Sequence, residues 1–472
     1  MTVTAGDARA RDGGLFIAGR WRPGERSLER RNPAQPGQLI GRFAAASAAD
    51  VADAYAAATD AGRAWARVPA PHRGEILTRA AGLVERRMAP IAATLALEEG
   101  KAIRDARDEV CRAAAVLRRH GTDCQHALGE LFPGHVEGTL VRTVREPLGV
   151  VCAITPWNLS SAIPAGKLAA ALALGNTVVW NPAVVASATA ALVTAALVDA
   201  GLPAGVMNLV TGTGAETVDA LLNGVGLRGV TFTGPAASRR PVELRAAERG
   251  LRTRLESGGK NPSVVLADAD LDRAAGSIVR GAMLATGQQC TATRRAIVVD
   301  EVFDDLAERL IEGASKLRVG DPLEERTDLG PLASAARLRA VTEYFGLAAR
   351  EGLEPACGGI ASDPAEGYFV QPTVFVDVDP ASRLATEEVF GPVLTVVRAT
   401  DTADAVQLAN ATEPGQSGSI FTRDLATAIR CAGTLDAGVV YLNGESDARP
   451  DAQTATAREF FTKAKTVYIE GV

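Results

Sequence analysis

The sequence predicts an α/β protein of about three domains, and three observations support this. Its 472 residues are too many for one compact core. Hydrophobic residues make up 47% and charged residues 22%, an ordinary globular balance. Between Gly149 and Gly234, β-rich runs alternate with helical stretches, which is typical of a parallel, doubly wound sheet. A second alternating region runs from about Leu255 to Ala437, so we expect two α/β units.

The N-terminal part is expected to contain a strand and then several helices. The first ~13 residues are small and polar, as in a flexible tail, and Leu15 to Trp21 alternates like a strand. From Ala48 to about His126, apolar residues recur at spacings of three and four, which predicts helices. Asp50 is placed to cap the first helix and Pro71 to start another.

The middle of the chain carries the first alternating region. The runs Thr139–Arg145 and Leu148–Ile154 are strand-like and meet at a turn around Pro147–Gly149. The expected parallel strands have the sequences GVVCAI, NTVVW, VMNLVTG and GVTFTG, and helices are expected to begin near Pro164, Ala186 and Ala215. Ligands bind such a sheet at the carboxyl ends of its strands.

The second alternating region supplies four more strand candidates, NPSVVLA, RRAIVVD, TVFVDV and PVLTVVRA. A short β-branched and aromatic run, Thr466–Ile469, predicts one further strand at the C-terminus.

Composition excludes several classes of function. A net charge of −6 leaves no basic footprint for nucleic acid. None of the six cysteines forms a Cys-x-x-Cys pair, so no metal site is expected, and such sparse cysteines suit a reducing cytosol. The N-terminus has no apolar core of a secretory signal, and the apolar run Ala165–Val179 is too interrupted to span a membrane. We therefore expect a cytoplasmic protein without nucleic-acid or membrane partners.

Cys290 is the first candidate for catalysis. It lies in G-Q-Q-C-T at Gly287–Thr291, whose polar, glycine-containing flanks suit an accessible thiol. A thiol attacks only as the thiolate, so it needs a base or a positive field nearby. The four histidines, His72, His120, His126 and His135, all lie far upstream, and no local motif supports a Cys–His pair.

Two further side chains complete a plausible catalytic set. Glu256 precedes two glycines and a lysine just before an expected strand, and a carboxylate there is a candidate general base. Asn158 ends I-T-P-W-N at the carboxyl end of another strand, where its amide can donate to a developing oxyanion. Each segment alone is also compatible with an ordinary turn.

Seven short motifs occur along the chain in a fixed order. They are I-T-P-W-N at Ile154–Asn158, P-A-G-K at Pro164–Lys167, G-N-T-V-V at Gly175–Val179, F-T-G at Phe232–Gly234, L-E-S-G-G-K-N-P at Leu255–Pro262, G-Q-Q-C-T at Gly287–Thr291 and E-E-V-F-G-P-V at Glu387–Val393. In this order they resemble the aldehyde dehydrogenase superfamily, and the resemblance covers roughly residues 14 to 471.

The resemblance implies a role for each matching catalytic residue. Cys290 resembles the nucleophile that forms a thiohemiacetal and then a thioester, and Asn158 with the Cys290 N–H resembles the oxyanion hole. Glu256 resembles the base that activates water, which favours hydrolysis to a free acid over acyl transfer to coenzyme A. Lys167 matches the lysine near the cofactor ribose and a proton path.

The resemblance also implies NAD or NADP as the cofactor. Glu388 matches the carboxylate that holds the nicotinamide ribose, and Phe390 the aromatic beside it. The remaining implied cofactor residues are Thr155, Pro156, Trp157, Lys167, Asn181, Gly234 and Pro235.

Three departures from the family pattern touch ligand sites. Asn181 and Val184 replace a lysine and a glutamate at the adenosine ribose, with opposite effects on a preference for NADP, so NAD versus NADP stays open. Pro235 removes an N–H that would face the pyrophosphate, and Arg239 replaces a glycine. After Asn443, roughly 20 residues of a glycine-rich segment are missing, which implies a reshaped substrate mouth.

Several arginines and a proline allow two interpretations. Arg239 and Arg240 are either cations for phosphate or a solvated charge pair, and Pro241 would strain a helix interior. Arg294 and Arg295 are either contacts for an anionic substrate or structural ion-pair residues.

The resemblance implies a Rossmann-like cofactor domain at 1–131 and 150–254, an α/β catalytic domain at 255–437, and a small β oligomerisation arm at 132–149 and 438–472. The arm would pair 136–145 with the C-terminal strand, and because a two-stranded hairpin is marginal alone we expect a homodimer or homotetramer. The leading hypothesis is NAD(P)-dependent oxidation of an aldehyde to a carboxylic acid. The alternatives are a non-redox cysteine-dependent enzyme with a weakened dinucleotide site, and a catalytically silent partner subunit.

Overall fold

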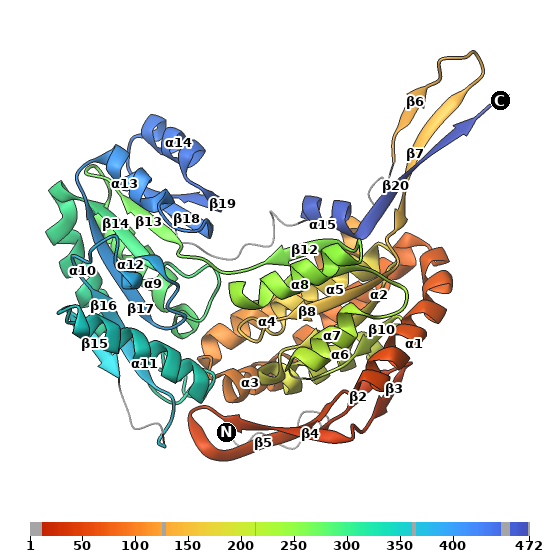
Figure 1. Ribbon diagram of the computed structural model, residues 1–472, viewed down its shortest axis with the longest axis horizontal. Coiled ribbons are helices and arrows are strands. Elements are labelled where there is room, and N and C mark those ends of the chain that lie inside the picture. Colours follow the sequence, from red (N-terminus) through yellow and green to blue (C-terminus); the bar gives the residue numbers. More distant parts are fainter. Residues whose placement is uncertain (1–11, 125–128, 213, 361–364, 445–453, 471–472) are drawn as a thin grey trace.

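The computed structural model of the chain describes residues 12–124, 129–212, 214–360, 365–444 and 454–470. Two seven-stranded sheets, each covered by helices, form two lobes that face each other, and a small sheet projects from one end (Figure 1). The α/β class predicted from the alternating pattern is therefore confirmed.

The first lobe is built on a sheet with the strand order β12-β11-β8-β9-β10-β2-β3. Its parallel strands are β8 (Val150–Thr155), β9 (Thr177–Pro182), β10 (Met207–Leu209), β11 (Leu227–Thr233) and β12 (Arg252–Glu256). The helices between them are α5 (Ala162–Ala173), α6 (Ser187–Asp199), α7 (Gly214–Leu222) and α8 (Ala236–Glu248). The predicted order of strands and helices is confirmed, and β12 carries the sheet to Glu256. Helix α8 continues through Pro241, so this proline does not end it.

The N-terminal region differs in detail from the prediction. Leu15 to Trp21 is not one strand but a hairpin of β2 (Leu15–Ile17) and β3 (Arg20–Arg22), because the chain reverses at Ala18 and Gly19, which have φ of 52° and 80°. Asp50 is not the cap of the first helix. Ser47 occupies that position, and Asp50 closes a capping box with it.

The remaining N-terminal elements frame the first lobe. A sheet of β1 (Asp12–Gly13), β4 (Arg26–Asn32) and β5 (Gln35–Ala45) was not predicted, and the rest of the expected tail lies outside the described residues. The helices are α1 (Ala48–Arg67), α2 (Ala70–Arg86), α3 (Met88–Glu99) and α4 (Ile103–Asp123). Helix α2 thus begins one residue before Pro71, at Ala70.

The second lobe is built on a sheet with the order β15-β16-β17-β14-β13-β18-β19. The strands are β13 (Pro262–Val265), β14 (Arg295–Val299), β15 (Cys357–Ile360), β16 (Val370–Phe375), β17 (Val393–Ala399), β18 (Gly415–Phe421) and β19 (Ala437–Leu442). Its helices are α9 (Leu271–Met283), α10 (Phe303–Ser315), α11 (Ala335–Arg350), α12 (Arg383–Thr386), α13 (Thr402–Asn410) and α14 (Leu425–Thr434). The four predicted strands are present, whereas β15, β18 and β19 were missed.

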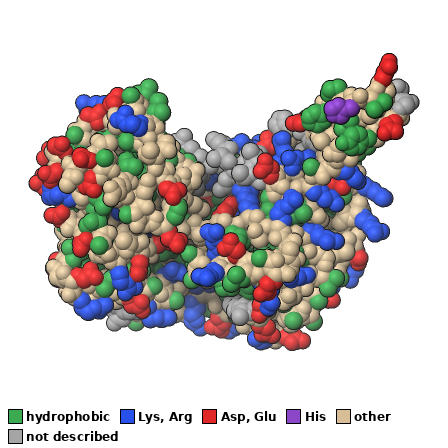
Figure 2. All heavy atoms as spheres, turned by 45° about the horizontal axis from the view of Figure 1, so that its top comes forward, with side chains coloured by type: hydrophobic (Ala, Val, Ile, Leu, Met, Phe, Trp, Pro, Cys, Tyr) green, Lys and Arg blue, Asp and Glu red, His purple; other side chains and the backbone are tan. Residues whose placement is uncertain are grey.

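A three-stranded sheet forms the projecting arm. Strand β7 (Leu140–Pro147) pairs antiparallel with β20 (Thr462–Ile469), so the predicted pairing of these two segments is confirmed. A third strand, β6 (Leu131–Pro133), adds to β7, and α15 (Thr454–Phe461) leads into β20. Hydrophobic side chains gather on the arm (Figure 2), where Leu131 is 70% and Tyr468 68% exposed.

None of the helices in the described residues is long and apolar enough to cross a membrane.

Candidate active site

Cys290 lies on a strained loop between α9 and β14. The three residues Ala285, Thr286 and Gly287 have φ of 51°, 58° and 67°, a left-handed conformation that the first two adopt only at a cost. Asp105 on α4 accepts from the N–H of Ala285 at 3.1 Å, and Thr286 Oγ1 donates to Gly330 O at 3.0 Å. These bonds fix the loop from both lobes and present Cys290 half-buried at its end.

Arg294 supports the loop of Cys290 through hydrogen bonds to its backbone. Its side chain is fully buried, and it donates to the carbonyl oxygens of Gly287 at 2.6 Å and Gln289 at 2.7 Å. It also forms an ion pair with Glu388 at 3.3 Å. The contacts of Arg294 therefore favour a structural role over a contact with an anionic substrate. Arg295 also has a structural role, because it donates to the carbonyl groups of Leu408 and Ala409.

Glu256 lies at the carboxyl end of β12, held at both oxygens. Lys167 on α5 and Thr233 on β11 donate to Oε2 at 3.0 and 2.6 Å, and Arg254 lies 3.2 Å from Oε1. Burial opposes the negative charge, but Lys167, Arg254 and Thr233 outweigh burial and lower the pKa of Glu256 to about 2. Glu256 is thus ionised at all working pH values.

The thiol of Cys290 is held in its protonated form. Burial, together with the charges of Glu256 and Glu388, raises its pKa to about 12, and Arg294 opposes this rise. The influence of both carboxylates places Glu256 and Glu388 in electrostatic reach of the sulfur. Of the predicted site residues, Lys167 contacts Glu256, and Glu388 pairs with Arg294, which also holds the loop of Cys290.

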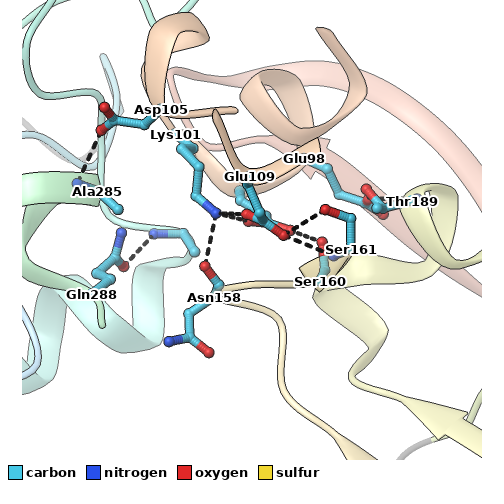
Figure 3. A network of polar contacts seen from close by, with 12 residues as sticks. Glu98, Lys101, Asp105, Glu109, Asn158, Ser160, Ser161, Thr189, Ala285 and Gln288 are labelled. Atoms are coloured by element: carbon cyan, nitrogen blue, oxygen red, sulfur yellow. Dashed lines mark hydrogen bonds and ion pairs between the residues drawn. The ribbon is translucent and has the colours of Figure 1, made fainter. Parts of the chain in front are cut away.

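Asn158 is fixed through its backbone by a buried charge network that the sequence motifs did not reveal. Lys101 Nζ donates to Asn158 O at 2.8 Å and forms ion pairs with Glu99 and Glu109. Glu109 in turn accepts from the N–H and the hydroxyl of Ser161 at 2.8 Å. Figure 3 shows the Asn158 side chain pointing away from this network, so Lys101 holds the backbone and leaves the amide for another partner.

The predicted cofactor residues of the first lobe lie at the carboxyl ends of the adjacent strands β11, β8 and β9, where such a sheet binds ligands. Two of their side chains are already committed within the protein. Thr155 Oγ1 accepts from Trp180 Nε1 at 2.9 Å, and Asn181 donates to Val210 O at 2.8 Å. Asn181 thus carries no positive charge, and its side-chain amide already donates a hydrogen bond within the protein.

The start of α8 faces the same edge of the sheet. Pro235 is the residue before the helix rather than its first residue, so the first helical N–H groups remain. Arg239 lies 3.7 Å from Glu243, and its Nε, although buried, has no hydrogen-bond partner among the described residues. A helix N-terminus with a cation one turn away suits a pyrophosphate.

The second lobe contributes Glu388 and Phe390 on the segment before β17. The ring of Phe390 meets that of Trp157 edge to face at 5.8 Å, and the Arg294 guanidinium lies 5.1 Å from its centre. This contact joins the two lobes at the cofactor side. The acceptor Glu388, the aromatic ring and the helix N-terminus together fit a nicotinamide dinucleotide by their chemistry.

A cavity of about 510 Å³ opens between α4 and α9. Leu159 and Gln289, the chain neighbours of Asn158 and Cys290, are among its lining residues. Its charged lining includes Arg104, Arg112 and Arg280 as well as acidic groups. The segment 445–453, part of the expected reshaped mouth, lies outside the described residues.

Sequence reasoning missed Arg254, Thr233, Lys101 and Glu109. An i, i+2 spacing on a strand puts Arg254 on the same face as Glu256, and this signal was available once β12 was recognised. The Lys101 network had no comparable signal, because its members lie 8 to 61 residues apart.

Comparisons with known proteins agree with this geometry. The sequence profile of the aldehyde dehydrogenase family matches residues 21–456. The chain is 36% identical to alpha-ketoglutaric semialdehyde dehydrogenase of Bacillus subtilis (strain 168), over 96% of this chain and 97% of that protein. It is 36% identical to 1-pyrroline-5-carboxylate dehydrogenase of Geobacillus thermodenitrificans, over 91% and 84%.

The fold is also similar to solved structures. An NAD-dependent aldehyde dehydrogenase from Sinorhizobium meliloti matches with a TM-score of 0.95 at 32% identity, covering 98% of this chain and 96% of that chain. These dehydrogenases give no support to a non-redox enzyme or a silent partner subunit.

Proposed function

The chain belongs to the aldehyde dehydrogenase family, an NAD(P)-dependent group of aldehyde-oxidising enzymes, and we propose that Cys290, Asn158 and Glu256 carry out the reaction. The observation that supports this assignment best is the position of Cys290 at the end of a strained loop that Asp105 and Arg294 hold from both lobes, with Glu388 paired to Arg294. We propose the division into a cofactor domain, a catalytic domain and an arm that the sequence suggests, with β19 assigned to the catalytic domain because it pairs in that sheet.

The first half of the reaction forms an acyl group on Cys290. The sulfur bonds to the aldehyde carbon, the thiol proton passes through water to the Glu256 carboxylate, and the carbonyl oxygen gains a negative charge. The Asn158 amide stabilises this charge by donating to it, and Lys101 keeps Asn158 in place through its backbone. A bound NAD or NADP supplies the hydride acceptor, and Glu388, Phe390, Trp157 and the start of α8 would hold it.

The second half releases the acid. Glu256 takes a proton from water, the water oxygen bonds to the thioester carbon, and the carbon–sulfur bond breaks to restore the thiol. Lys167 contacts Glu256 directly and is placed to pass the proton on. Thr155 and Asn181 serve the site by shaping the ends of β8 and β9.

The test combines turnover with one variant for each half-reaction. The unmodified chain is expected to reduce NAD or NADP in the presence of an aldehyde. Cys290→Ala should abolish this, and Glu256→Gln should allow one turnover and then stall with an acyl group on Cys290, detected by intact mass. A Glu256→Gln variant with unchanged steady-state turnover would exclude Glu256 as the base.

We further propose that the aldehyde carries a carboxylate. The names of two similar proteins contain such substrates, a semialdehyde of ketoglutaric acid and a pyrroline carboxylate. Arg112 and Arg280 on the cavity wall are of a residue type suited to a carboxylate, whereas Arg104 is paired with Asp328. A comparison of kcat/KM for succinic semialdehyde and butyraldehyde tests this, since equal values would contradict it. Arg280→Ala should reduce only the former.

Finally, we propose that the chain assembles as a homodimer or homotetramer through the arm. The exposed apolar residues Leu131, Val136 and Tyr468 lie on the arm, and Leu425 and Ile429 of α14 lie exposed beside the edge strand β19. Sedimentation should give a dimer or larger species, and Tyr468→Lys should weaken it. A monomer at micromolar concentration would contradict the proposal.

A further inference from the structure

Arg254 is the charged neighbour of Glu256 to which the reaction above assigns no role. Both residues lie on β12, two positions apart, and so project from the same face of the sheet. Opposite them on β11, Thr231 pairs with Arg254 and Thr233 pairs with Glu256. The guanidinium lies 3.2 Å from Glu256 Oε1, on the side of the carboxylate opposite to the partners of Oε2.

The carboxylate is therefore fixed at three points. Lys167 and Thr233 hold Oε2, and Arg254 holds Oε1. A general base must turn one oxygen toward the water it activates, which requires hydrogen-bond distance. Any rotation of the carboxylate toward the acyl group on Cys290 breaks at least one of these three contacts.

The contact with Arg254 is the one that breaks at least cost. Lys167 is 5% exposed and also donates to Thr231 at 2.8 Å, so separating it would leave a buried cation without its ion partner. Arg254 is 16% exposed, and water can replace the carboxylate around its guanidinium. Oε1 is thus the oxygen that turns, and Arg254 is the group that restrains it.

We propose that Arg254 is a positioning residue that holds Glu256 against the sheet and thereby limits how fast the acyl-enzyme is hydrolysed. This inference rests on the proposed role of Glu256 as the base. The titratable groups around Glu256 are Lys167 from α5, Arg254 on its own strand and the thiol of Cys290, and His120 of α4 lies close to Arg254. Arg254 is the more exposed of the two cations, so replacing it disturbs the packing less than replacing Lys167 would.

The test isolates hydrolysis of the acyl group. Cys290 is acylated with p-nitrophenyl acetate without cofactor, excess ester is removed, and the loss of the acyl mass is followed by intact mass spectrometry. Arg254→Gln is expected to hydrolyse the acyl group about fivefold faster than the unmodified chain, the factor that loss of an ion pair of about 1 kcal/mol gives. The rate of acylation should stay the same.

Three matched variants make the result specific. Arg254→Lys keeps a cation and should restore the slower hydrolysis. Arg252→Gln, on the same strand and face but bound to the carbonyl groups of Glu459 and Phe460, should leave hydrolysis unchanged. Arg254→Met, which keeps the apolar stem, replaces Arg254→Gln if the latter does not fold by circular dichroism.

The possible outcomes separate the two proposals. Unchanged or slower hydrolysis in Arg254→Gln, or equal acceleration in Arg252→Gln, overturns the role of Arg254. Unchanged hydrolysis in Glu256→Gln instead overturns Glu256 as the base, whatever Arg254 does. Faster hydrolysis in Arg254→Gln with slow hydrolysis in Glu256→Gln supports both.

Discussion

Replacing Lys101 by methionine should destabilise the protein strongly, although no reacting role is proposed for Lys101. Its ammonium group is 4% exposed and forms ion pairs with Glu99 and Glu109, which are 1% and 2% exposed. It also donates to Asn158 O. Methionine has a similar length and fills the space, so the change removes charge and hydrogen bonds with little loss of volume.

The magnitude follows from these contacts. Removing one partner of a buried ion pair costs about 3 to 5 kcal/mol, and the lost hydrogen bond to Asn158 adds about 1 kcal/mol. Part of this is offset, because burial already raises the pKa of Glu99, and a protonated Glu99 needs no cation. A net loss of about 4 kcal/mol lowers Tm by roughly 8 to 16 °C if the first lobe unfolds as one unit of 150 to 250 residues.

Thermal melting followed by circular dichroism measures this effect, with Lys316→Met as the matched control. Lys316 also pairs with a glutamate, Glu312, but is 70% exposed, so its loss should cost less than about 1 kcal/mol. Lys101→Met should also lower kcat more than it raises KM, since Asn158 loses its backbone support. A Tm of Lys101→Met within about 2 °C of the control would refute the reasoning about the network.

Three more predictions address the charge and the strain around Cys290 and the buried carboxyl groups of α3. Glu388→Gln removes a charge that raises the pKa of the thiol, so iodoacetamide should label Cys290 faster at pH 8; unchanged labelling would mean that Glu388 does not act on the sulfur. Ala285→Gly relieves a residue with φ of 51° and should raise the free energy of unfolding by about 1 kcal/mol in urea titrations, whereas a loss of stability would show that Ala285 is unstrained. Burial raises the pKa of Glu98 from 4.5 to about 7 and also raises that of Glu99, so folding retains protons that the unfolded chain has released. The stability that these two carboxyl groups contribute is complete below pH 4.5 and is lost as the pH rises through about 7. Glu99→Gln should therefore flatten the fall of Tm between pH 5 and 8, and an unaltered slope of Tm against pH would contradict the raised pKa of Glu99.

Several parallel strands of both lobes were predictable because they are short β-branched runs buried on both faces. β8, β9 and β14 have this character, and each was recognised. β18, with the sequence GQSGSIF, was missed because glycine and serine give no strand signal, and it forms only because β13 pairs with it. The hairpin at Ala18 was missed because its turn contains a non-glycine residue at positive φ.

The motifs identify the residues proposed for catalysis, but not the partners of these residues. Motifs name the residues that act, whereas the charges that tune them come from neighbours across strands and between lobes. To recognise Arg254 as a partner, one needs the register of its strand. To recognise Lys101, one needs to know that it packs against the backbone of Asn158. To recognise Arg294, one needs to know that its buried side chain binds the loop of Cys290.

The two carboxylates near Cys290 each have an arginine of their own, and the two pairs differ in a way that bears on the reaction. Glu388 is held by Arg294, which is fully buried and also carries the catalytic loop, so this pair cannot separate without disturbing Gly287 and Gln289. Glu256 is held by Arg254, which water reaches, so this pair can separate. Both carboxylates keep the resting thiol protonated, which protects it from oxidation but also slows its attack. Only the charge of Glu256 can change position at low cost, so the same movement that brings the base to water also alters the field on the sulfur.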